Sequence, residues 1–168
     1  MSYDPLAWHD FFVMLGGAAA ALTGLVFVAL SLHLDRVAAD PIHRFRAGVS
    51  VAGLSSVVVL SGAFLVPTKS HQAVGIEVIA ISAFFVWLNA TADRNRAPLI
   101  PGQPRPPTRL LYGLTTTAVY TIAGLALFFG SGAGLLILAA AMGNSMVASI
   151  KTAWDLMIQL RHVPTGAA

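Results

Sequence analysis

The sequence feature that most restricts the fold is an uncharged run of 41 residues, from Leu110 to Ile150. A single helix over this run would be about 61 Å long, because an α-helix rises about 1.5 Å per residue. The hydrocarbon core of a bilayer is only about 30 Å thick. The run therefore predicts two membrane-spanning helices, 110–130 and 133–150. The glycine-rich segment 130–134 is expected to form the turn between them.

The remainder of the chain is similarly apolar. Of its 168 residues, 57% are apolar and 10% are charged, whereas an ordinary soluble domain has about 25% charged residues. A small soluble domain cannot bury so much apolar surface. Three further segments have spanning length: 11–32, 47–66 and 73–90. We therefore predict an all-α, polytopic membrane protein with five transmembrane helices, arranged as one bundle domain over residues 1–168.

The basic residues predict the orientation of these spans. With five spans, nine of the ten basic residues fall on one side of the membrane, and Lys69 alone falls on the other. The nine are Arg36, Arg44, Arg46, Arg94, Arg96, Arg105, Arg109, Lys151 and Arg161. Because loops rich in Lys and Arg stay cytoplasmic, we expect an external N-terminus and a cytoplasmic C-terminus. The abundance of alanine and of arginine over lysine favours a GC-rich bacterial genome, and hence the plasma (inner) membrane.

The segment 91–109 is the one sizeable polar loop, and it contains five of the nine prolines. Such a composition favours extended or irregular structure. Two interpretations of this loop are open. In the first, its arginines bind anionic lipid or a docking partner. In the second, the loop is a solvated connector whose arginines only fix the topology. Together with two arginines of the first cytoplasmic loop, the candidate contacts to anionic lipid are Arg44, Arg46, Arg94, Arg96, Arg105 and Arg109.

Small residues recur at helical spacing in three of the predicted spans. Residues four apart lie on one helix face, and small ones let two helix backbones approach closely in lipid. The candidate helix-packing residues are Gly16, Ala20, Gly24, Gly48, Ala52 and Gly143. Spacing alone leaves open whether they pack within one chain or between chains, so a homo-oligomer is a candidate assembly.

Glu77 is the one ionisable residue well inside a predicted span. A carboxylate in a bilayer is costly, which makes it a candidate functional residue. Three interpretations are open: it lines an ion pathway as part of a ring in an oligomer, it is a protonation switch, or it is structural. A structural Glu77 would reach the outer interface or pair with Lys69 or His71.

Polar residues also occur in the last two predicted spans. One face of span 110–130 carries Thr116, Thr117, Tyr120, Thr121 and Gly124. Thr117 and Thr121 are candidate pore-lining residues, although such hydroxyls often bond to the carbonyl one turn earlier or to a neighbouring helix. Asn144 needs a hydrogen-bond partner in hydrocarbon and is a candidate interhelical or ligand contact. With Glu77, Thr117 and Thr121 it is also a candidate pore or proton-sensitive residue. Lys151 and Asp155 are expected to form an ion pair at the end of the last span.

The remaining patterns exclude several classes of function. The chain has no cysteine, which excludes thiolate catalysis and Cys-based metal or redox sites. The histidines lack metal-ligand spacing, and no catalytic motif is present. We therefore expect no enzyme, cofactor, metal or nucleic-acid partner. The interpretation we favour is a homo-oligomeric channel or pore-type transport protein. The alternative is a non-catalytic membrane scaffold that packs through small-residue helix faces.

Overall fold

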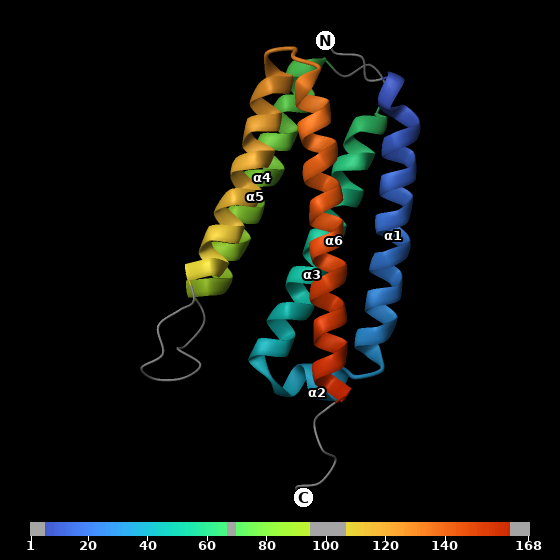
Figure 1. Ribbon diagram of the computed structural model, residues 1–168, viewed down its shortest axis with the longest axis vertical. Helices are drawn as coiled ribbons and strands as arrows, with labels where there is room; N and C mark the ends of the chain where they lie inside the picture. The colour runs from blue at the N-terminus through green and yellow to red at the C-terminus, as the bar shows by residue number, and fades with distance from the viewer. Residues whose placement is uncertain (1–5, 67–69, 95–106, 162–168) are drawn as a thin grey trace, which may run out of the picture. The chain divides into compact units, whose positions relative to one another are not determined.

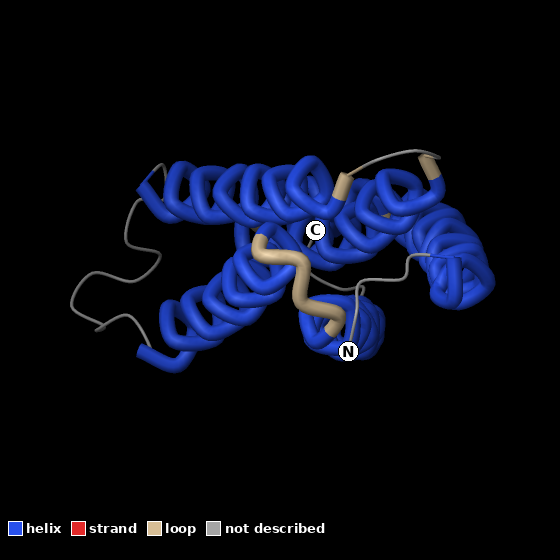
Figure 2. The backbone as a smooth tube through the Cα atoms, turned by 90° about the horizontal axis from the view of Figure 1, so that it is seen from above, coloured by secondary structure: helices blue, strands red, loops and turns tan. Residues whose placement is uncertain are grey.

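The computed structural model describes residues 6–66, 70–94 and 107–161, and all of its regular structure is helical (Figure 1). The elements are a short 3-10 helix η1 (Leu6–Trp8) and the α-helices α1 (His9–Ser31), α2 (Leu34–Ala39), α3 (Pro41–Leu65), α4 (His71–Arg94), α5 (Pro107–Phe128) and α6 (Ala133–Arg161). The described ranges contain no β-strand, as the uniformly blue helices of Figure 2 show. The predicted all-α class is therefore confirmed.

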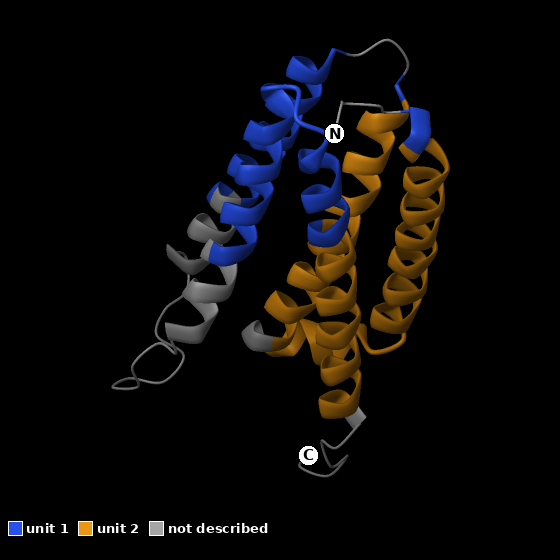
Figure 3. Cartoon of the chain, turned by 45° about the horizontal axis from the view of Figure 1, so that its top comes forward, with its two compact units in different colours: residues 1–7, 66–141 blue, residues 8–65, 142–168 orange. Residues whose placement is uncertain are grey.

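The chain divides into two compact units (Figure 3). Unit 1 comprises Met1–Ala7 and Val66–Ala141, and unit 2 comprises Trp8–Leu65 and Met142–Ala168. Unit 1 thus contains α4, α5 and the start of α6, whereas unit 2 contains α1, α2, α3 and the rest of α6. The prediction of one bundle domain remains a prediction.

Each predicted span corresponds to one helix, but the last helix is longer than the span. The predicted span 133–150 ends at the first charged residue, whereas α6 continues to Arg161. Charge limits how much of a helix can lie in hydrocarbon, but Lys and Asp do not end a helix. The sequence analysis did not predict α2, because its six residues are too few to show a helical period.

Three helices are long and apolar enough to cross a membrane: Leu6–Ser31, His43–Leu65 and Ala133–Leu160. Within the described residues of α4 and α5, the apolar helical parts are shorter, at His71–Phe85 and Thr115–Phe128. These lengths support a helical membrane protein with three candidate spans. The fourth and fifth spans, and the orientation of the chain, remain predictions.

Helix starts follow the local sequence. α3 begins at Pro41, where the fixed φ of proline suits the first helical position. Asp40 precedes it in an extended conformation, as the Asp-Pro pair predicts. α4 begins after Ser70, whose Oγ accepts a hydrogen bond from the backbone N–H of Ala73 at 3.3 Å. Such side-chain caps satisfy N–H groups that the first helical turn leaves open.

The predicted glycine turn lies between α5 and α6. Gly130 adopts φ +74°, a left-handed conformation that favours glycine. The N–H of Gly130 donates to the Leu127 carbonyl, and the N–H of Ser131 donates to the Ala126 carbonyl. These two bonds form a Schellman motif, which ends α5 and allows α6 to begin at Ala133.

Candidate functional site

The two helices of unit 1 that carry the candidate pore residues lie side by side, and their backbones touch (Figure 1). A Cβ atom added at Gly75 of α4 would lie 2.7 Å from both the Gly124 carbonyl oxygen and the Phe128 backbone nitrogen on α5. A Cβ at Gly124 would lie 2.7 Å from the Cγ1 atom of Ile79. Gly75 and Gly124 thus lie at a close approach of the two backbones. No small-residue repeat in the sequence marks this contact.

The candidate pore-lining hydroxyl of Thr121 is bonded within this helix pair. Its Oγ1 donates to the Thr117 carbonyl, one turn earlier, at 2.9 Å. Its Oγ1 also lies 3.0 Å from the Oγ of Ser82 on α4, close enough for a hydrogen bond. Thr117, Thr121 and Gly124 share one face by their spacing, and the Thr121 and Gly124 contacts turn this face toward α4. Here the hydroxyl joins two helices of one chain.

Glu77 lies on α4 and is half-buried, and its Oε2 atom is shielded from solvent. Its neighbours one turn away or adjacent on α4 are Val74, Val78 and Ile81, so its own helix surrounds it with apolar side chains. Glu77 also takes part in an interaction with another part of the molecule. A shielded carboxyl on such a residue fits the structural interpretation as well as the pathway interpretation.

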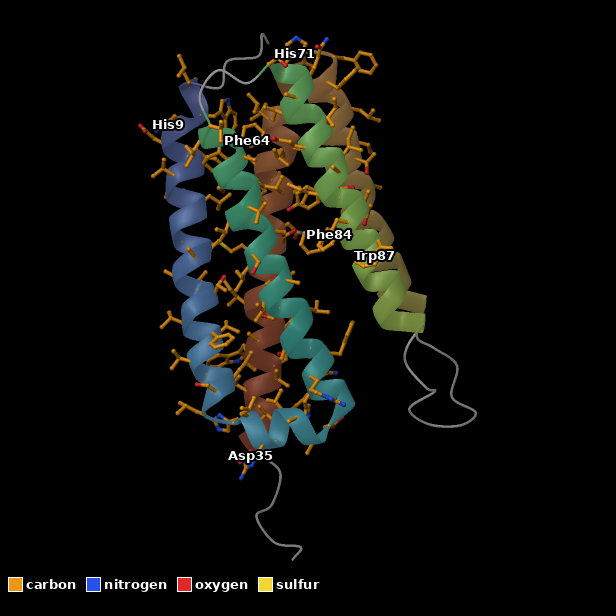
Figure 4. All side chains as sticks on the ribbon, turned by 180° about the vertical axis from the view of Figure 1, so that it is seen from behind. His9, Asp35, Phe64, His71, Phe84 and Trp87 are labelled. Carbon is orange, nitrogen blue, oxygen red and sulfur yellow. The ribbon has the colours of Figure 1, made fainter. Side chains whose placement is uncertain are left out.

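His71 caps the end of α5. Its Nδ1 atom lies 3.1 Å from the carbonyl oxygen of Phe128, the last residue of α5, and the ring packs beside Gly130. Figure 4 labels His71 at the start of α4. A donor at a helix C-terminus satisfies a carbonyl that has no partner within the helix. The sequence offered a pairing of His71 with Glu77 as one option. It did not predict the contact between His71 and the Phe128 carbonyl.

In unit 2, α1 and α3 pack at Gly16 and Ser61. A Cβ at Gly16 would lie 2.7 Å from the Ser61 Cβ, so the glycine is needed for the approach. One turn away, the rings of Phe12 and Phe64 stack with centroids 4.3 Å apart (Phe64 is labelled in Figure 4). The face of α1 that packs continues to Ala19, which is fully buried.

The other small residues of α1 lie outside this contact. Ala20 and Gly24 are exposed, and a Cβ at Gly24 would meet no atom within 4 Å. Gly17 and Ala21 are exposed beside them. Of the predicted packing residues of α1, the structure thus brings only Gly16 into contact with another helix of the chain.

The contact between α3 and α6 in unit 2 uses serine and glycine. The Ser50 Oγ donates to the Ser149 carbonyl at 2.8 Å, and the Ser149 side chain lies against Gly53, where a Cβ would clash. Gly48 and Gly143, two predicted packing residues, have open space where a Cβ would be. The third predicted residue of these helices, Ala52, is half-buried.

The end of unit 2 that holds α2 carries several basic residues. Arg36 donates to the Leu160 carbonyl near the end of α6 at 2.8 Å, and Arg46 donates to the Gln159 side chain. Val37 of α2 covers a small apolar cluster, which contains Ala47, Leu156 and Leu160. Arg44 is exposed. The side chains of Arg94 and Arg109 are not described, and Arg96 and Arg105 lie outside the described residues.

Asn144 is exposed on α6, and the described residues show no hydrogen bond from it to another helix, so its interhelical bond or ligand contact remains a prediction. Lys151 and Asp155 are also exposed, and the expected ion pair between them does not form. The sequence correctly located these polar groups on the last helix, but it did not reveal that they face outward.

Metal binding has no candidate centre in the described ranges, where no group of three or more His, Asp or Glu side chains is placed to hold an ion. Comparisons with protein-family models, with curated proteins and with solved structures found no match to this chain. The helix faces and the polar residues in the apolar helices are therefore the features that bear on function.

Proposed function

We propose that this chain is a non-catalytic integral membrane protein that binds other transmembrane helices through helix faces that its own fold leaves uncovered. The observation that carries this proposal is the exposure of α1. The candidate span Leu6–Ser31 is among the most apolar parts of the chain, yet only 17% of its most apolar window is buried. Such a surface has to contact lipid or another membrane helix.

The composition of the uncovered face favours another helix. Gly17, Ala20, Ala21 and Gly24 are exposed and lie within one sector of α1. Without large side chains, two helix backbones can approach closely, which strengthens van der Waals packing in lipid. By contrast, the Thr121 hydroxyl, which would serve a pore, is bonded inside the α4–α5 pair. The scaffold interpretation therefore has more support than the channel interpretation.

Large side chains on this face test the proposal. Gly17→Leu and Gly24→Leu should not disturb the fold, because no atom lies within 4 Å of a Cβ at either position. They should reduce co-purification of partner proteins from native membrane by at least several-fold. Ala18→Leu is the matched control, since Ala18 is exposed but lies about 100° around the helix from Gly17. Equal recovery of partners with all three variants would contradict the proposal.

A homo-oligomeric channel is the second candidate, and Glu77 is the observation that favours it. A carboxyl group in an apolar helix becomes a ring of carboxyls when copies assemble around an axis. Flux in liposomes tests this function. The channel interpretation expects ion flux that Glu77→Gln and Thr117→Val change. Absence of flux from a stable oligomer, or flux that neither variant changes, would rule it out.

The proposed setting is a bacterial plasma membrane, crossed by five helices, with the N-terminus outside. The support is the nine-to-one distribution of basic residues and the three helices of spanning length. Arg44 and Arg46 would then contact anionic head groups at the cytoplasmic surface. A reporter fused after Arg161 should be cytoplasmic, and one inserted near Ser70 should be external. The reverse pattern would contradict this orientation.

A further inference from the structure

The exposed side of α6 in unit 2 forms a continuous stripe along the helix. Its members follow at intervals of three or four residues, which is the spacing of one helix face. The exposed residues of this stripe are Asn144, Val147, Lys151, Trp154 and Ile158, with Asp155 beside them. The opposite side of α6, with Leu156 and Leu160, is buried in unit 2.

Asn144 makes this stripe unsuited to lipid alone. It lies within the candidate span Ala133–Leu160 and is exposed, and its carboxamide has no hydrogen bond to the residues that the structure describes. Hydrocarbon offers neither a donor nor an acceptor, so an amide that faces lipid remains unsatisfied. Next to it, a Cβ at Gly143 would meet no atom within 4 Å, which leaves room for the close approach of a second helix.

We propose that two copies of this chain associate about a two-fold axis through the α6 stripe, with their Asn144 carboxamides hydrogen-bonded to each other. A carboxamide contains both a donor and an acceptor. Two of them related by a two-fold axis can therefore satisfy each other, as a symmetric interface requires. This inference rests on the proposed membrane location and names a second copy as the partner of α6.

The charges farther along the stripe complement one another in the same arrangement. Lys151 and Asp155 are both exposed and do not pair within the chain. In the dimer, the long side chain of each Lys151 reaches Asp155 of the second copy. The two symmetric pairs offset the repulsion between the two Lys151 side chains. An unrelated helix would need its own amide and its own matching charges, whereas a second copy brings all of them.

Cysteine cross-linking tests this contact directly, because the chain has no cysteine of its own. Val147→Cys places a thiol on the stripe, one turn from Asn144. Val59→Cys on α3 is the matched control, since the two native side chains are 64% and 56% exposed. Upon oxidation in native membranes, Val147→Cys should form several-fold more covalent dimer than Val59→Cys. Equal yields, or an adduct of Val147→Cys with a different protein, would overturn the proposal.

The amide is tested in a chain that carries Val147→Cys. Asn144→Leu should weaken dimerisation roughly fivefold to thirtyfold, the effect of an interhelical hydrogen bond in model membrane helices. Asn144→Gln should retain most of the dimer, because it retains the carboxamide. The position is exposed, so neither change should alter thermal unfolding of the monomer. Unchanged cross-linking in Asn144→Leu would refute the role of the amide.

The ion pairs are tested by exchanging the charges. Lys151→Asp alone should lower the yield of covalent dimer, and the combination of Lys151→Asp with Asp155→Lys should restore it. No recovery in the double variant would contradict the proposed pairing. The α1 experiment separates this inference from the proposed function. If Gly17→Leu and Gly24→Leu release partners but Val147→Cys does not cross-link, only the α6 dimer is refuted.

Discussion

Replacing Gly75 with alanine should destabilise the α4–α5 pair, because the added methyl group meets backbone and not a flexible side chain. The Cβ would lie 2.7 Å from the Gly124 carbonyl oxygen and 2.8 Å from the Phe128 Cα. Relief requires the two helices to separate, since no rotamer change can move these atoms. Overpacking of this kind costs about 1–3 kcal/mol.

Alanine also has an advantage of about 1 kcal/mol over glycine inside a helix. The net destabilisation expected for Gly75→Ala is therefore about 0–2 kcal/mol, or up to roughly 8 °C in Tm for a chain of this size. Thermal unfolding in detergent, followed by circular dichroism, measures it. Gly62→Ala is the matched control, because Gly62 lies in α3 with open space at its Cβ. If Gly75→Ala were as stable as Gly62→Ala, the inferred backbone contact would be wrong.

Two further changes test local features by the same unfolding measurement. Gly130→Ala should lower the free energy of unfolding by about 1–2 kcal/mol, because a residue with a Cβ is disfavoured at φ +74°. Gly130→Asn should lower it by less. Equal stability of the native chain and both variants would contradict the Schellman turn. Ser50→Ala removes the hydrogen bond to the Ser149 carbonyl and should lower the free energy of unfolding by about 0.6 kcal/mol. The control is Ser31→Ala, at an exposed position. If Ser50→Ala were as stable as Ser31→Ala, the bond would contribute nothing to stability.

The sequence predicted the helices well because hydrocarbon imposes a length and excludes charge. The run from Leu110 to Ile150 therefore gave both helices and the turn at Gly130. α6 continues beyond the predicted span 133–150 to Arg161, since that prediction concerned the length within the membrane and not the end of the helix. α2 has six residues, which is less than two helical turns, and it left no periodic signal.

The sequence predicted less about which side of a helix meets a neighbour. Small residues occur on several sides of α1, and only the structure separates the packed Gly16 and Ala19 from the exposed Gly24. The approach of Gly75 to Gly124 depends on two single glycines in distant segments, so no local pattern marks it. Burial is a property of the assembled helices, and hydropathy cannot assign it when almost every residue is apolar.

Site-specific photo-cross-linking from α1 shows whether this face binds other membrane helices. A photoreactive side chain is placed at Gly24 in the full chain and activated in native membranes. We expect discrete protein adducts at Gly24 that disappear when Gly17→Leu is added, and few adducts from the same probe at exposed Ala18. Adducts with lipid alone at Gly24, or the same adducts from both positions, would contradict it.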